Sequence, residues 1–440
     1  MLFDWAAQPF FTLVTTFVYA PYFATWVAED VVTGQAWWGY AKAAAGVVIA
    51  LLSPLLGAIA DAAGRRKPWI AAFGALLVIG SAALWWGKPG EGALLVLVAF
   101  AVAGIGAEFA TVFNNAMMPS LVPPERLGRL SGTGWAVGYV GGLISLFIVL
   151  GFLAASPHNG RTLLGLTPLF GLDPAQHQGE RIAGPLTAAW FALFVLPLFV
   201  FTPDQAGRLP LRAAIGDGFR TLAHTLRTLP RHRNLALFLI ANMIIGDGLV
   251  ALFAFGGIYA AGTFGWGTIE IGLFGIFLTV TGTVGAYLGG RLDDRFGAKR
   301  VIVASLVALT AAVTAILLID ADYLPLIGPV APPAHDGALF GAAAERAFLA
   351  IGIVIGLAAG PLQAAARTLL VRLAPADRVT QFFGLFALSG KVTSFLGPTL
   401  VALATDLSGR QSAALAVLVA FFGIGGWLLA GVGAPPGRGR

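Results

Sequence analysis

Long apolar runs dominate the chain. Twelve of them reach roughly the 20 residues that a helix needs to cross about 30 Å of hydrocarbon. They span 3–28, 36–60, 68–86, 92–118, 132–154, 184–202, 234–262, 268–290, 300–319, 344–371, 380–404 and 411–431. The runs are continuously apolar, unlike the alternating segments of membrane barrels. The pattern therefore predicts an all-α membrane protein with twelve transmembrane helices.

One long polar connection, 203–233, separates six runs from the other six. Its apolar residues recur at helical spacing, which predicts an amphipathic helix lying at the membrane interface. They are Leu211, Ile215, Phe219, Leu222, Leu226 and Leu229. We therefore predict a bundle over 1–202, a cytoplasmic linker over 203–233 and a second bundle over 234–440. The first run has no basic leader or small-residue cleavage site, so we expect a retained helix.

Composition agrees with a membrane protein. The chain is 58% hydrophobic and 11% charged, with a mean hydropathy of +0.84, whereas soluble domains are about a quarter charged. Cysteine is absent, which excludes disulfides, thiolate metal sites and cysteine nucleophiles.

Charge placement predicts the orientation. Nineteen of the 27 Lys and Arg residues fall in one set of alternate loops and at the C-terminus. Such loops are cytoplasmic in most membrane proteins. Both termini are therefore expected in the cytoplasm, and the loops around Arg161 and Asp336 outside. No basic stretch is interleaved with aromatics, so the net charge of +6 does not indicate nucleic-acid binding.

Two loop motifs occur once in each half of the chain. GAIADAAGRRK at 57–67 returns as GRLDDRFGAKR at 290–300, and LVPPER at 121–126 returns as LAPADR at 373–378, each followed by a glycine, Gly132 or Gly384. The first motif carries Gly57, Asp61, Gly64, Arg65 and Arg66, matched by Gly290, Asp294, Gly297 and Lys299. Glycine suits a tight turn, and the acid can engage the positive end of a neighbouring helix. Two independent motifs that each occur in both halves indicate duplicated six-helix halves, an architecture known among transporters.

The first motif resembles the signature loop of the major facilitator superfamily. A narrower resemblance, to the vacuole-effluxer-like branch that includes the autophagy-linked amino-acid effluxer, rests on segments throughout the chain. They are DWA at 4–6, APYF at 20–23, LSP at 52–54, FNNA at 113–116, PPERLG at 123–128, LSGK at 388–391 and FLGP at 395–398. The resemblance implies the major facilitator fold, two six-helix bundles related by pseudo-symmetry. It also implies that the signature loops steady one state of the transport cycle, although a role only as a turn stays open.

Ionisable residues inside predicted helices need a reason, because each costs a few kcal/mol in the bilayer. Those expected to carry function are Asp4, Glu108, Asp247, Arg367 and Lys391. By the resemblance, helices 1, 4, 7 and 10 line a central cavity, and four of the five lie on them. Asn115 shares a helix face with Glu108, as Gln363 does with Arg367, and Asn114 adjoins the first pair. The alternative for Glu108, Asp247 and Arg367 is a structural buried ion pair, and for Asp4 it is a solvated helix end. Lys391 either packs into a turn of helix 11 or gates the cytoplasmic side.

No enzyme, nucleotide or cofactor motif is present in the sequence. The glycines before Lys391 are spaced wrongly for a phosphate-binding loop, and no histidines have metal-ligand spacing. We therefore expect no enzyme, cofactor or metal, and a monomeric secondary transporter in a bacterial cytoplasmic membrane.

The expected cargo is a small polar solute. An amino acid fits the mixture of buried acids and base, and proton coupling, if present, is expected at Glu108 or Asp247. A transporter-like receptor without net transport, and a channel, are the alternatives. The receptor would be expected to carry a further cytoplasmic domain, and the channel a continuous polar lining.

Overall fold

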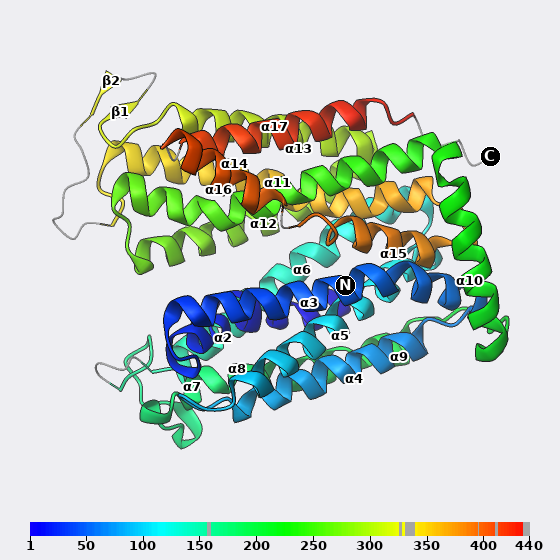
Figure 1. Ribbon diagram of the computed structural model, residues 1–440, viewed down its shortest axis with the longest axis horizontal. Helices are drawn as coiled ribbons and strands as arrows, with labels where there is room; N and C mark the ends of the chain where they lie inside the picture. Colours follow the sequence, from blue (N-terminus) through cyan, green and yellow to red (C-terminus); the bar gives the residue numbers. More distant parts are fainter. Residues whose placement is uncertain (156–159, 325–327, 331–338, 395, 410–411, 434–440) are drawn as a thin grey trace. The chain divides into compact units, whose positions relative to one another are not determined.

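The computed structural model describes residues 1–155, 160–324, 328–330, 339–394, 396–409 and 412–433 (Figure 1). Asp336 of the predicted outer loop, and the C-terminal residues 434–440, lie outside this described part. Within it, ten helical stretches are long and apolar enough to cross a membrane, and two shorter apolar helices follow in the region of predicted helices 11 and 12. The predicted all-α membrane architecture is confirmed.

The chain forms two compact units, which do not follow a simple cut in the sequence. Unit 1 comprises 1–121, 137–223 and 377–388, and unit 2 comprises 122–136, 224–376 and 389–440. Short segments from each predicted bundle thus pack within the unit formed mainly by the other.

Unit 1 contains most of the first six predicted helices. Its elements are α1 (Leu2–Pro9), α2 (Tyr19–Tyr22), α3 (Val31–Ala63), α4 (Lys67–Ala83), α5 (Ala93–Leu121), most of α6 (Leu127–Ile148), α7 (Gln178–Arg181), α8 (Ala183–Phe194), α9 (Leu196–Phe201), most of α10 (Leu211–Thr228) and nearly all of α15 (Val379–Ser389). Aromatic rings fill its core, where Trp38 stacks on Phe100 with ring centroids 4.0 Å apart. Asp30 begins α3 by accepting from the main-chain N–H groups of Val32 and Thr33. A hydrogen bond from the Thr33 hydroxyl lowers the pKa of Asp30.

Unit 2 holds the remaining elements. They are α11 (Arg233–Phe264), α12 (Thr268–Phe296), α13 (Ala298–Leu317), a short antiparallel pair of strands β1 (Tyr323–Leu324) and β2 (Gly328–Pro329), α14 (Ala343–Leu373), α16 (Leu396–Ser408) and α17 (Ser412–Ala430). Glycines let α12 and α14 approach closely: a Cβ on Gly285 would meet the Leu357 main chain, and one on Gly360 the Gly282 carbonyl.

Predicted helix 1 is not a regular α-helix. Its backbone changes to π-helix over 10–17 and again over 23–27. The hydroxyls of Thr15 and Thr16 follow the wider turn, donating to the carbonyls of Phe10 and Phe11 five residues earlier. Wide turns of this kind are frequent at functional sites.

Predicted helix 11 was expected to be continuous over 380–404, which is wrong. α15 ends at Ser389 and α16 begins at Leu396, with turns between them. Gly390 favours the break, and the Ser394 hydroxyl and main-chain N–H both donate to the Lys391 carbonyl, competing with helical bonding. Lys391 therefore lies in the turn between the two helices and not within a continuous helix 11.

The predicted linker helix is present as α10. Ala214 is buried, and Gly218 packs against Ile59 of α3. Four of the predicted apolar residues, Leu211, Ile215, Phe219 and Leu226, are exposed. This leaves an apolar face available to the membrane interface, as expected of an amphipathic helix.

Candidate functional site

The first signature loop binds the start of α15. The Asp61 carboxylate accepts from the main-chain N–H groups of Thr380 and Gln381, at 3.2 and 2.8 Å. Arg66 completes the cluster, with Nη2 3.0 Å from Asp61 Oδ1 and Nε 3.0 Å from Thr380 Oγ1. The first turn of a helix has unpaired N–H groups and a partial positive charge, which an acid satisfies. All of these groups are buried.

The second signature loop makes the equivalent contact with α6. Asp294 accepts from the main-chain N–H groups of Gly128 and Arg129, at 2.8 and 3.2 Å. Its basic partner is the Arg129 side chain, whose Nε lies 3.1 Å from Asp294 Oδ2. That side chain is 61% exposed, whereas Arg66 in the first cluster is almost fully buried. The expected contact of each acid with a helix start is present. The Asp61 cluster is better shielded from solvent than the Asp294 cluster.

The acids, the glycines and the helix starts of the two clusters occupy corresponding positions, but the basic partners Arg66 and Arg129 do not. Thr380 and Gln381 stand where Gly128 and Arg129 stand in the repeated loop motif, counted from Leu373 and Leu121. The glycines correspond as well. A Cβ on Gly57 would meet the Thr380 carbonyl oxygen at 2.6 Å, and one on Gly290 would meet the Gly128 carbonyl. Glycine is required at both places because the helices touch through their backbones.

Gly64 and Gly297 form the turns after each acid. Their φ angles are +87° and +90°, which side chains rarely adopt. The basic residues that follow have different uses. Arg65 is exposed, whereas Lys299 donates through Nζ to the carbonyls of Ala430 and Val432 at the end of α17. Lysine at a helix C-terminus satisfies unpaired carbonyls and the negative end of the helix.

Asp293 forms a further buried cluster that the sequence did not single out. Its carboxylate lies 2.8 Å from Arg372 Nη1 and accepts a hydrogen bond from the Thr368 hydroxyl of α14. The one sequence feature that indicates this second contact is the pair of adjacent acids, Asp293 and Asp294. Neighbouring helical residues point about 100° apart, so Asp293 and Asp294 reach different helices.

Unit 1 holds the predicted cavity residues of the first bundle. Glu108 and Asn114 of α5 are partly buried, and Asn115 is buried. Asp4 lies 4.0 Å from the Met1 amino group and packs against Gly138 of α6. Thr111 lies between Glu108 and Asn115 on α5 and donates to the Ala107 carbonyl. It adds a hydroxyl to this polar stretch that the charge-based search did not find.

Unit 2 places Asp247 beside the break in predicted helix 11. Asp247 is 2% exposed in the middle of α11, and Thr393 of the break lies beside its carboxylate. Gly397 of α16 packs against the Asp247 carbonyl. Lys391 belongs to the same turn. A buried acid, a basic residue and interrupted backbone are thus gathered in one part of this unit.

Arg367 is buried on α14 and contacts the first turns of α6. Its Nε lies 3.1 Å from Ser131 Oγ and its Nη2 2.8 Å from the Ser131 carbonyl. The guanidinium stacks over the Trp135 ring at 4.6 Å. Gln363, one turn earlier, donates to the Ala359 carbonyl of its own helix. The contact with α6 was not predicted, because nothing in the sequence links Arg367 to Ser131.

A family model described as vacuole effluxer Atg22 like matches residues 27–439. The chain belongs to this family. It is 26% identical over 434 residues to the uncharacterized MFS-type transporter YxiO of Bacillus subtilis, covering 98% of this chain and 93% of YxiO. It is also 26% identical to Autophagy-related protein 22 of Cryptococcus neoformans, with 64% of this chain covering 46% of that protein. The match therefore spans about half the length of this fungal family member.

Solved transporters confirm the fold. The proton:xylose symporter XylE aligns with a TM-score of 0.70 at 12% identity, over 98% of this chain and 94% of XylE. The E. coli fucose:proton symporter FucP aligns at 0.66 and 15% identity, covering 98% of this chain and 97% of FucP. This chain therefore has the twelve-helix major facilitator fold. Its membership of the vacuole effluxer family supports a role as a transporter.

Proposed function

We propose that the chain is a secondary active transporter that moves a small polar solute by alternating access between residues 1–202 and 234–440. The supporting observation is the matched pair of acid clusters. Asp61 and Asp294 each bind a helix start from the other proposed half. Rocking of the halves would have to break these bonds, so the bonds bias which state is populated. We also propose that the protein is a monomer and that it lies in a bacterial cytoplasmic membrane.

An amino acid is the proposed solute class. Its carboxylate would suit the guanidinium of Arg367, and its amine would suit Glu108 or Asp247. The break beside Asp247 supports this assignment, because interrupted helices in transporters line solute and ion sites near the middle of the membrane. Lys391 in the break offers a second contact for an anionic group.

Transport of labelled amino acids into proteoliposomes, with and without an imposed pH gradient, tests the proposal. We expect at least one amino acid to accumulate faster with the wild type than with empty vesicles. In Glu108→Gln or Asp247→Asn, solute exchange should persist while acceleration by the pH gradient disappears, if that acid carries the proton. Full gradient response in both variants would refute proton coupling through these acids. Absence of transport for every amino acid would refute the solute class.

Orientation is tested by labelling single cysteines in this naturally cysteine-free chain. Arg65→Cys should react with a membrane-impermeant maleimide only from the cytoplasm, and Arg161→Cys only from outside. Both side chains are exposed, so accessibility will report sidedness and not burial. Labelling of position 161 from the cytoplasm alone would overturn the proposed topology.

A further inference from the structure

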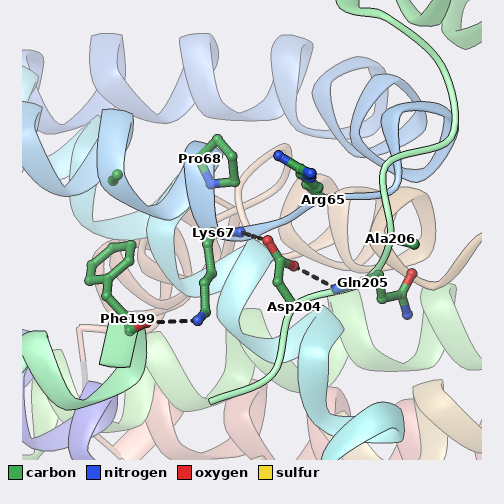
Figure 2. Close-up of a pocket in the computed structure, with 8 residues that line it drawn as sticks. Arg65, Lys67, Pro68, Phe199, Asp204, Gln205 and Ala206 are labelled. Carbon is green, nitrogen blue, oxygen red and sulfur yellow. Dashed lines mark hydrogen bonds between the residues drawn. The ribbon is translucent and has the colours of Figure 1, made fainter. Parts of the chain in front are cut away.

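A basic pocket lies where the first signature loop meets α4 and the segment after α9 (Figure 2). Its volume is about 620 Å³. The lining residues are Arg65, Lys67, Pro68, Ala71, Phe199, Asp204, Gln205 and Ala206. Of the acid clusters described above it shares only the loop, since the Arg66 side chain faces Asp61 instead.

The pocket carries surplus positive charge available to a ligand. Its one acid, Asp204, is already bound by the main-chain N–H groups of Arg66, Lys67 and Gln205, at 2.9, 3.1 and 2.9 Å. Lys67 donates to the Phe199 carbonyl at 2.8 Å, which uses one of its three protons. The Arg65 side chain is exposed and lines the same pocket as Lys67. Two basic groups thus face the pocket against one acid that is satisfied by backbone.

An apolar groove continues from this pocket along α4. It has a volume of about 330 Å³ and is lined by side chains of α4 and of the α8–α9 segment. The lining residues are Ile70, Ala71, Gly74, Ala75, Val78, Ile79, Phe191, Ala192, Val195 and Phe199. Ala71 and Phe199 line both cavities, so groove and pocket are continuous. Both helices lie in membrane-spanning stretches, where lipid chains are the available solvent.

We propose that pocket and groove together bind one anionic phospholipid. The phosphate would lie between Arg65 and Lys67, and an acyl chain would lie along Ala75 and Phe191. Basic pockets between transmembrane helices are suited to anionic head groups. The adjoining groove distinguishes a lipid from free phosphate, because only the lipid has a chain to fill it.

The second half of the chain provides an internal comparison. A groove of about 700 Å³ runs between α13 and α17 and includes Ala311, Thr314 and Gly426. No basic residue lines it in the described part of the chain. Lys299 of α13 is engaged with the carbonyls of Ala430, the last residue of α17, and of Val432, just beyond it. This groove should accept lipid chains without preference for the head group.

Lipid binding to the purified full-length protein, measured by native mass spectrometry with phosphatidylglycerol against phosphatidylcholine, tests the proposal. We expect a clear preference for phosphatidylglycerol in the wild type. Because each basic side chain near an anionic lipid contributes about fivefold in affinity, Arg65→Gln with Lys67→Gln should reduce this preference by roughly 25-fold. Arg300→Gln removes an exposed charge at the corresponding turn of the other half and should change nothing. No head-group preference, or equal loss in the Arg300 variant, would overturn the proposal.

The groove is tested separately from the charge. Ala75→Trp fills it from an exposed position, and Ala311→Trp is the matched control in the second groove. Both substitutions can displace lipid chains, but only Ala75→Trp should lower the preference for phosphatidylglycerol over phosphatidylcholine and the extra rise in Tm that phosphatidylglycerol produces. If excess inorganic phosphate raises the Tm as much as the lipid does, and Ala75→Trp alters neither effect, the site binds phosphate alone and the lipid proposal is wrong.

Discussion

Transport by Asp61→Asn is expected to fall steeply while folding and membrane abundance change little. The substitution keeps the shape of the side chain but removes the charge that holds two N–H groups of α15 and the guanidinium of Arg66. Hydrogen bonds to charged groups contribute about 1.5–3 kcal/mol, so the balance between transport states should shift by roughly 10- to 150-fold. Initial uptake rates in proteoliposomes, normalised to protein, measure this effect.

Asp294→Asn is the matched control within the same molecule. It removes the equivalent charge, but its partner Arg129 is largely exposed, and exposed ion pairs contribute about 0–1 kcal/mol. Its effect on transport should therefore have the same direction and be smaller. Wild-type transport in both variants would leave the signature loops with a role only as turns.

Arg367→Ala is expected to weaken the recognition of carboxylated solutes strongly. If the guanidinium holds the solute carboxylate, its loss should weaken apparent affinity by roughly 10- to 150-fold, corresponding to about 1.5–3 kcal/mol. Arg367→Lys should recover only part of the affinity, because lysine lacks the planar fork and the stacking over Trp135. The measurements are concentration-dependent uptake and the Tm of each variant.

Ser131→Ala separates this role from a structural one. It removes the hydroxyl that accepts from Arg367 Nε and donates to the Ala364 carbonyl, and it leaves the charge of Arg367 in place. If Arg367 only fastens α14 to α6, Ser131→Ala should reproduce part of the Tm loss, and Arg367→Ala should lower stability without a selective loss of solute affinity. When an acid such as Asp247 is its permanent partner, adding Asp247→Asn to Arg367→Ala should restore much of the Tm without transport. Wild-type affinity, rate and stability in Arg367→Ala would remove the residue from the site and weaken the case for an amino acid.

The helices could be predicted from the sequence because each depends on a local property, an apolar stretch long enough for the bilayer. The contacts of Asp61 with a helix start could also be anticipated, since the motif places an acid just before a glycine turn. The contact of Arg367 with Ser131 could not, because it joins residues 236 apart. The break before α16 was also missed, because its few turn residues lie between long apolar stretches and barely change the average hydropathy.

Each half of the chain supplies one acid and one helix start, and each acid binds the helix start of the other half. This exchange has the form of an isologous interface, in which residue i of one copy contacts residue j of the other and the reverse contact follows by symmetry. A six-helix ancestor carrying one acid and one such helix could therefore form both bonds by pairing with its own copy. Fusion of two such genes would preserve both bonds and then free each to diverge. The basic partner now comes from the signature loop in one cluster, as Arg66, and from the helix start in the other, as Arg129.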